Sequence, residues 1–189
     1  MLKTYSMFDD ILQRDQHAVA KGTILKSEGE ESHSRMYVAG GWLAASKSLE
    51  DGEQQIIEFI LPGETYDPTA TDGKTSFLQI EALCDAVIVS IDKTSWAQLL
   101  RQDPELRKSE RQREIAAQAR QSERMLRLGR ASAETRIAYV LIELCIRVSR
   151  QGTGFDSEFH VPFGQQQLGD FTGLSSVHVC RTLRRLNRA

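Results

Sequence analysis

Cysteine is scarce in this sequence: the 189 residues contain three, and they lie far apart at Cys84, Cys145 and Cys180. No Cys-x-x-Cys pair occurs, which argues against a zinc site, and this spacing also argues against a disulfide framework. The cysteine content favours a reducing compartment, and we predict a cytoplasmic protein.

Long hydrophobic runs are also lacking. No stretch approaches the ~18 consecutive apolar residues that a membrane span requires. Residues 1–10 contain two aspartates and no apolar core, so the start of the sequence does not resemble a secretory signal. We therefore expect no membrane association.

Lysine is absent from residues 120–189, where all 11 basic side chains are arginine and face only 6 acidic ones. Residues 1–119 have the opposite balance, with 13 basic and 20 acidic side chains. This asymmetry predicts that only the C-terminal part binds a polyanion such as double-stranded DNA. A solvated basic face without a partner is the alternative.

Short apolar or alternating runs between residues 20 and 92 are typical of β-strands. Turn signals separate them, and Asp51-Gly52 between two runs is a strong hairpin signal. Many short strands at about ten-residue spacing predict a sandwich or barrel-like roll. The expected strands are residues 22–26, 35–39, 42–46, 55–60, 77–82 and 86–91.

A long helix is predicted over residues 105–128, which are rich in Arg, Glu, Gln and Ala. Its less polar positions recur at steps of four, three and four, as in a coiled coil, and these are Ile115, Ala119, Ser122 and Leu126. The pattern predicts a homodimer joined along this seam. Because Ala and Ser bury little area, a solvated helix without a partner remains the alternative.

Residues 163–187 have the pattern of a helix-turn-helix. Gly169 allows two helices to cross closely, Gly173 suits the turn, and Ser175 can cap the second helix. Leu168, Leu174, Val179, Leu183 and Leu186 supply the buried positions, while Thr172 and Thr182 stand where aliphatic residues are usual. An ordinary helical hairpin without a nucleic-acid partner is the alternative.

The sequence resembles the Crp/Fnr family of bacterial transcription regulators over nearly its whole length. The resemblance is carried by Gly22-Thr-Ile with Glu28-Gly-Glu30, Leu61-Pro-Gly-Glu64, Leu128-Gly-Arg-Ala-Ser-Ala-Glu-Thr-Arg-Ile-Ala138, and Gln166-Gln-Leu-Gly followed by Gly173-Leu-Ser-Ser-Val-His-Val-Cys-Arg-Thr-Leu183. It implies an α+β protein with an antiparallel, jelly-roll-like β-roll over 1–103, a dimerisation helix over 104–130 and a helix-turn-helix domain over 131–189. The sequence ends at Ala189, where family members continue into a β-hairpin wing, so we expect an incomplete wing.

The family's DNA-reading positions fall on the second helix of the motif. The resemblance implies base contacts by Ser176, Val177 and Arg181, with Arg181 bidentate to a guanine. Contacts to phosphate are expected from Ser175, His178, Arg184 and Gln166. A palindromic operator and RNA polymerase are the implied partners beside the second copy.

The sensor part lacks the family's known cofactor signatures. In the cyclic-nucleotide branch an Arg-Ser or Arg-Thr pair clamps the phosphate, but Ser76-Phe77 stands at these positions, so we expect no cyclic AMP binding. No cysteine precedes Cys84, which excludes the N-terminal iron–sulfur cluster of the oxygen-sensing branch. Haem ligation by the isolated His17 or His33 is the remaining alternative. We predict no cofactor and leave the effector open.

Cys180 lies among arginines near the N-terminal half of the predicted second helix, an environment that makes thiols reactive. Its oxidation is therefore a candidate means of blocking DNA binding.

Two other function classes are alternatives to a DNA-binding regulator. A ligand- or redox-sensing adaptor with a weakened DNA-binding domain would act through protein contacts. A cupin-type enzyme would need a His-x-His pair with further metal ligands, but His33 lacks such a partner and no other histidine lies between His33 and His160. We predict that the protein is not an enzyme.

Overall fold

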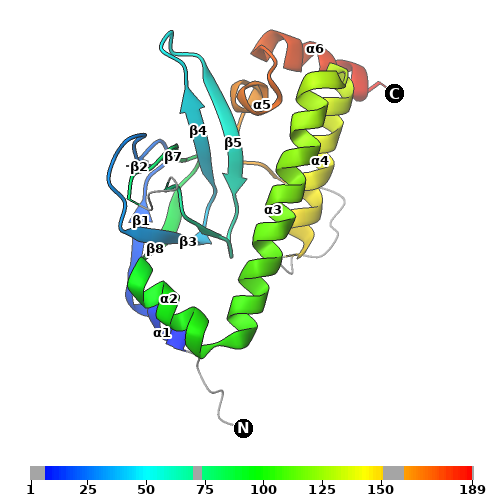
Figure 1. Ribbon diagram of the computed structural model, residues 1–189. Helices are drawn as coiled ribbons and strands as arrows, with labels where there is room; N and C mark the ends of the chain where they lie inside the picture. The colour runs from blue at the N-terminus through cyan, green and yellow to red at the C-terminus, as the bar shows by residue number, and fades with distance from the viewer. Residues whose placement is uncertain (1–6, 70–73, 151–159, 189) are drawn as a thin grey trace. The chain divides into compact units, whose positions relative to one another are not determined.

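The computed structural model describes residues 7–69, 74–150 and 160–188, and Figure 1 shows their helices and strands. The chain divides into two compact units, which are described separately: residues 1–47 with 57–111, and residues 48–56 with 112–189. The first contains most of the β-structure and the second most of the helices. The predicted α+β class with a β-roll and a helix-turn-helix is confirmed.

The strands of the roll form two four-stranded sheets, in the orders β1-β8-β3-β6 and β2-β7-β4-β5. Consecutive strands often lie in different sheets, which is the arrangement of a roll rather than of a simple meander. The strands are β1 (Gln16–Val19), β2 (Ile24–Lys26), β3 (Ser34–Gly40), β4 (Leu43–Ser48), β5 (Gln54–Ile60), β6 (Thr65–Tyr66), β7 (Gln79–Ala82) and β8 (Ala86–Asp92).

The core of the roll comes from alternate residues of these strands. Val38, Leu43 and Ile80 are among its fully buried side chains, because successive side chains in a strand point to opposite faces of the sheet. Gly52 has a φ of 88° in the turn between β4 and β5. The predicted Asp51-Gly52 turn is therefore confirmed.

Two short helices extend the roll. They are α1 (Met7–Arg14) and α2 (Lys93–Gln102). The indole ring of Trp96 in α2 packs with Val89 and Ile91 of β8 and makes an edge contact with the ring of Phe8 in α1. These contacts give the helices and β8 a second hydrophobic cluster.

Capping residues define the ends of the helices. The carboxylate of Asp103 accepts hydrogen bonds from the N–H groups of Glu105 and Leu106, and Pro104 occupies the first turn, where its missing N–H costs nothing. Ser132 caps the following helix by accepting from the N–H of Thr135. These helices are α3 (Pro104–Arg130) and α4 (Ala133–Val148).

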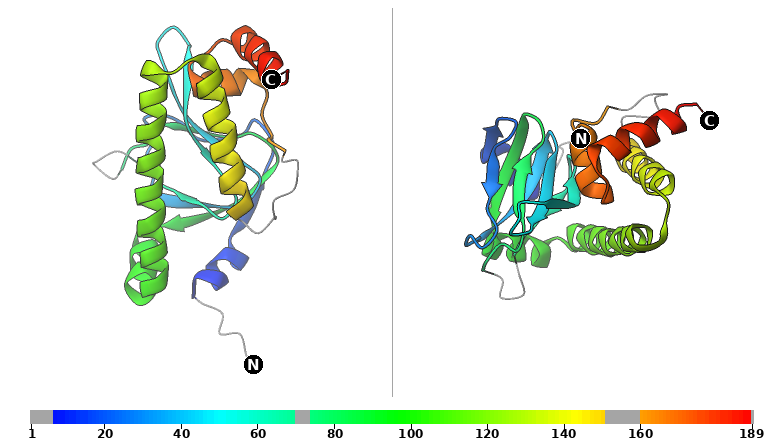
Figure 2. Two further views of the ribbon diagram at one scale, coloured as in Figure 1. Left: turned by 90° about the vertical axis from the view of Figure 1, so that its right-hand side faces the viewer. Right: turned by 90° about the horizontal axis from the view of Figure 1, so that it is seen from above.

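In the helical unit, α4 runs back alongside α3, as the views in Figure 2 show. The buried carboxylate of Glu143 lies 3.3 Å from both the Arg120 and the Arg147 guanidinium groups. Removing one partner of such a buried group leaves an uncompensated charge. The Arg120–Glu143 contact therefore joins α3 to α4 through buried charges.

Candidate nucleic-acid interface

Two short helices and a tight turn form the helix-turn-helix, α5 (Gln165–Thr172) and α6 (Ser176–Leu186). Gly173 has a φ of 66° and ends α5 in the left-handed conformation, which glycine adopts without a Cβ clash. The hydroxyl of Ser175 accepts a hydrogen bond from the N–H of His178, so it caps α6 as expected.

The crossing of α5 and α6 is close at Gly169. A Cβ atom there would lie 2.3 Å from the carbonyl oxygen of Leu174, far inside van der Waals contact. Leu174 also donates its N–H to the Gly169 carbonyl oxygen at 3.0 Å. Glycine is therefore required at this position, as the sequence predicted.

Helix α6 has a buried side and an exposed side. Val179 and Thr182 are completely buried, whereas Val177, Arg181 and Arg184 are exposed. The helix is thus anchored by one face and presents the other to solvent. The arginines predicted to meet DNA lie on the exposed face.

The other predicted contact residues have varied surroundings. Ser176 is half-buried and His178 is exposed. The amide of Gln166 donates to the carboxylate of Asp170 at 2.8 Å, and burial raises the pKa of Asp170 despite this hydrogen bond. Cys180 is a half-buried free thiol.

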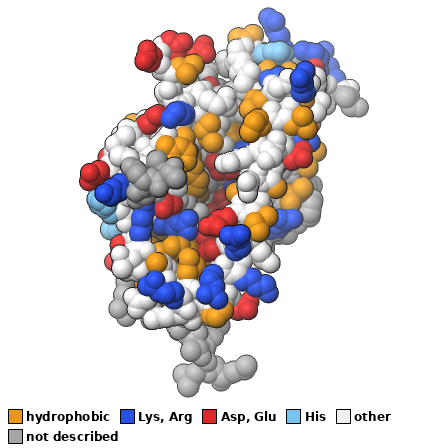
Figure 3. Space-filling view, viewed as in Figure 1, with side chains coloured by type: hydrophobic (Ala, Val, Ile, Leu, Met, Phe, Trp, Pro, Cys, Tyr) orange, Lys and Arg blue, Asp and Glu red, His pale blue; other side chains and the backbone are white. Residues whose placement is uncertain are grey.

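Positive charge gathers where α6 lies (Figure 3), and the arginines of this helix contribute to it. An acidic residue lies beside this helix: Glu134, in the first turn of α4, places its carboxylate 2.6 Å from the Arg185 guanidinium. A hydrogen bond from its own backbone N–H, together with smaller contributions from the charges of Arg185 and His178, lowers the pKa of Glu134.

The predicted dimer seam is uncovered in the single chain. Ile115 and Leu126 are 56% and 59% exposed, and Ala119 and Ser122 are exposed as well. All four lie on α3, and the role of this helix in dimerisation remains a prediction. The boundaries of the domains themselves remain a prediction.

Sequence reasoning did not identify the tertiary contacts of three residues in this unit. Phe171 is buried and carries the Arg124 guanidinium over its ring at 4.5 Å. Glu134 pairs with Arg185, and Arg136 donates to the Thr172 carbonyl oxygen at 3.3 Å. The segment Glu134-Thr-Arg136 was noted as part of a family motif, but sequence spacing could not identify its partners.

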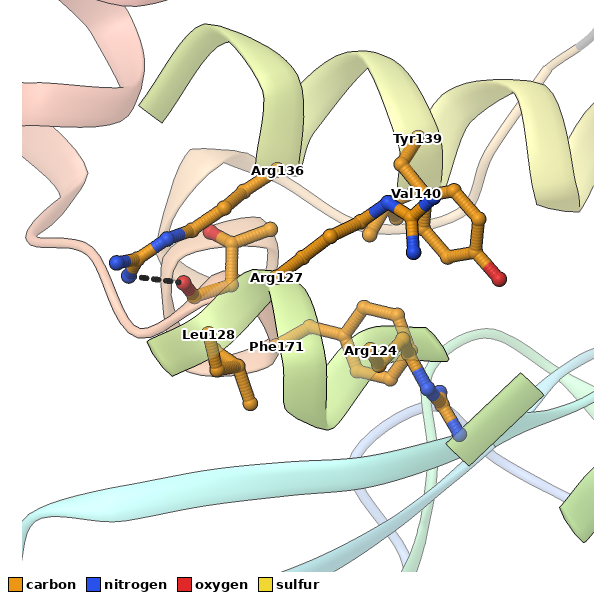
Figure 4. A pocket seen from close by; sticks show the side chains of 8 residues that line it. Arg124, Arg127, Leu128, Arg136, Tyr139, Val140 and Phe171 are labelled. Atoms are coloured by element: carbon orange, nitrogen blue, oxygen red, sulfur yellow. Dashed lines mark hydrogen bonds between the residues drawn. The ribbon is translucent and has the colours of Figure 1, made fainter. Parts of the chain in front are cut away.

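A small pocket lies where α3, α4 and α5 meet, and Figure 4 shows its lining. The guanidinium groups at its edge are already engaged: Arg136 with Thr172, Arg127 over the Tyr139 ring at 3.8 Å and Arg124 over the ring of Phe171. The pocket is therefore part of the packing between the helices.

In the roll, the positions that form the nucleotide clamp in the family's cyclic-nucleotide branch hold other residues with contacts of their own. The Ser76 hydroxyl is buried and bonds to the Leu78 carbonyl oxygen, and Phe77 is exposed. The carboxylate of Glu64 accepts from the N–H of Leu61 within its own turn. Lys47 is paired with Glu28 at 2.7 Å.

The described residues contain neither a metal-ligating cluster nor a helix suited to spanning a membrane. No group of three or more His, Cys, Asp and Glu side chains there is arranged to hold a metal ion. None of the helices in these same ranges has both the length and the apolar composition needed to cross a bilayer.

The two buried threonines of the motif allow a matched test of stability. The Thr182 hydroxyl has no hydrogen-bond partner among the described residues, whereas the Thr172 hydroxyl donates to the Leu168 carbonyl oxygen at 2.6 Å. We expect Thr182→Val to raise the free energy of unfolding by about 1 kcal/mol, because an unsatisfied buried hydroxyl is removed. Thr172→Val should lower it, because a hydrogen bond is lost. Denaturant titration measures both, and a loss of stability in Thr182→Val would contradict the assignment.

Comparison with known families and structures agrees with this architecture. The cyclic nucleotide-binding domain model matches residues 16–103 and the Crp-like helix-turn-helix domain model matches residues 135–189. The structure of FixK2 from Bradyrhizobium japonicum is similar in fold, with a TM-score of 0.78 and 24% identity over 92% of this chain and 84% of that chain.

Characterised relatives are similar over most of their length. The nitrogen fixation regulation protein FixK of Rhizobium meliloti is 28% identical over 87% of this chain and 72% of its own. The transcriptional activator protein FnrA of Stutzerimonas stutzeri is 28% identical over 95% of this chain and 73% of its own. With both domain models matched in the expected order, the chain belongs to the Crp/Fnr family of DNA-binding transcription regulators.

Proposed function

We propose that this regulator binds a palindromic DNA operator as a homodimer and reads bases with Ser176, Val177 and Arg181. The observation that carries the proposal is the exposed face of α6, where Val177 and Arg181 point away from a buried stripe that includes Val179. A helix anchored in this way can enter the major groove, whose base edges distinguish all four base pairs. Arg184, His178, Ser175 and Gln166 are the proposed phosphate contacts.

The second copy is proposed to pack along Ile115, Ala119, Ser122 and Leu126. These exposed positions keep the spacing of a coiled-coil seam along α3. Two-fold symmetry would then present two recognition helices to half-sites about 34–36 Å apart.

The roll is proposed to respond to a signal other than cyclic AMP. A phosphate requires a desolvated cation or an array of N–H donors. Ser76 and Phe77 supply no cation at the clamp positions, and Lys47 is engaged by Glu28. The oxidation of Cys180, contact with RNA polymerase and a cytoplasmic location remain predictions from the sequence.

The first experiment measures affinity for a selected operator and for random DNA across a salt series. A regulator of this kind should show a linear fall of log affinity with log salt and a preference for operator of about 10³-fold or more. An adaptor acting through protein contacts would show neither.

Arg181→Ala tests the base contact directly. Losing a bidentate contact to guanine should reduce operator affinity by about 1–3 kcal/mol per half-site and relax the choice at one base pair. Binding to operators with each base substituted at that position, measured by fluorescence anisotropy, gives the discrimination. An equal loss on operator and random DNA would show that Arg181 does not read a base.

A further inference from the structure

Adjacent arginines on α6 have different surroundings. Arg184 is exposed and forms no ion pair with the described residues, whereas the Arg185 guanidinium lies 2.6 Å from the carboxylate of Glu134. The two side chains carry the same charge, but they differ in whether a carboxylate of the protein already pairs with the guanidinium group. Arg184 is available to a phosphate, and Arg185 is engaged by its own protein.

The position of Glu134 is restrained because hydrogen bonds hold the first turn of α4 in place. The Ser132 hydroxyl caps this turn. Arg136 donates from Nε to the Ala131 carbonyl oxygen at 3.1 Å and from Nη1 to the Thr172 carbonyl oxygen at 3.3 Å. Thr172 is the last residue of α5, where a cation is favourable for the exposed carbonyl groups. Figure 4 shows Arg136 reaching from α4 to this carbonyl group.

We propose that Glu134 positions the recognition helix by holding Arg185, so that Arg185 acts as a positioning residue and not as a phosphate contact. This inference rests on the proposed reading of DNA by α6. Arg185 lies four residues after Arg181, about one turn farther along nearly the same side of the helix. A tether at Arg185 therefore restrains rotation of α6 about its own axis, which would otherwise move Val177 and Arg181 away from their base pairs.

The expected effect is moderate because the pair is partly exposed, with 60% of the Arg185 side chain and 36% of that of Glu134 accessible. Exposed ion pairs change equilibria by up to about five-fold. The ratio of operator to random-DNA affinity is the appropriate readout, since the general electrostatic effect of a removed charge acts on both DNAs.

The experiment titrates wild type, Arg185→Gln, Arg185→Lys, Glu134→Gln and the double variant Glu134→Gln/Arg185→Gln against a selected operator and random DNA at several salt concentrations. Arg185→Gln and Glu134→Gln should each lower the affinity ratio about three-fold. The double variant should be no worse than either single variant, because both remove the same interaction. Arg185→Lys, which keeps the ion pair, should restore the wild-type ratio.

Arg184→Gln is the matched comparison. It should weaken binding to both DNAs and reduce the slope of log affinity against log salt by about one per recognition helix, while Arg185→Gln leaves this slope unchanged. A reduced slope in Arg185→Gln with equal losses on both DNAs would overturn the inference and make Arg185 a phosphate contact. Additive losses in the double variant would also overturn it. Absence of operator preference in wild type would instead refute the proposed function. Thermal unfolding of each variant identifies any loss of folding.

Discussion

Gly169→Ala is expected to destabilise the helical unit by about 3 kcal/mol and to remove most operator binding. The new Cβ atom would lie 2.3 Å from the backbone carbonyl oxygen of Leu174, and backbone cannot move aside as a flexible side chain can. The cost combines overpacking with loss of the hydrogen bond between Leu174 and Gly169. Denaturant unfolding followed by circular dichroism measures the stability, and anisotropy measures the binding.

Gly164→Ala is the control for this prediction. Gly164 precedes α5, has a negative φ of −100°, and its nearest neighbour to a new Cβ is the Gln167 side-chain oxygen at 3.5 Å. That is an ordinary contact, so the change should cost about 1 kcal/mol or less, the difference between glycine and alanine at an N-cap. Equal losses in the two variants would show that the crossing of α5 and α6 is looser than described.

Leu126→Glu is expected to convert the proposed dimer to monomers. Leu126 is 59% exposed in the single chain and lies on the proposed seam. In a two-fold dimer the substitution would bury two carboxylates close to one another, each with a desolvation cost of several kcal/mol. Sedimentation velocity should therefore show dissociation at concentrations where the wild-type protein is dimeric, with at least about 100-fold weaker association.

Met125→Glu is the matched control for the seam. Met125 is 70% exposed and adjacent in sequence, but it is displaced around the helix from the seam positions. A glutamate at this position would lie at the solvent-facing edge of the interface, where its charge should weaken dimer association only slightly. An intact Leu126→Glu dimer, or equal dissociation of both variants, would contradict the seam.

Strands that contain an apolar run of their own were predicted from the sequence, whereas β1 and β6, which contain none, were not. β3, β5 and β8 each have seven residues with buried positions that recur along the strand. β1 has three exposed residues out of four, and β6 has only two residues. Neither contains a hydrophobic pattern of its own, because the hydrogen bonds of β1 and β6 come from β8 and β3. Their existence depends on partners distant in the chain.

In the candidate DNA interface, too, some features could be predicted from the sequence and others could not. Glycines at Gly169 and Gly173, the cap at Ser175 and the buried stripe of α6 follow from short-range geometry, so the sequence was sufficient to predict them. The pair of Glu134 with Arg185 joins residues 51 positions apart, and no local pattern connects them. The two unusual threonines were recognisable from their positions, but only the structure distinguishes the hydrogen-bonded Thr172 from Thr182.

The amino-acid sequence alone determined the class of this protein, its helix-turn-helix and the side of α6 that faces solvent, because turns, caps and helical periodicity depend on neighbours a few residues apart. Tertiary structure decided which charges are free to meet DNA and which are engaged within the protein. Arg184 and Arg185 are chemically identical and adjacent in sequence, but Glu134 approaches from another helix and pairs with Arg185. A contact ion pair requires its charged groups to lie within about 4 Å of one another, so it depends on distances that the order of residues does not contain.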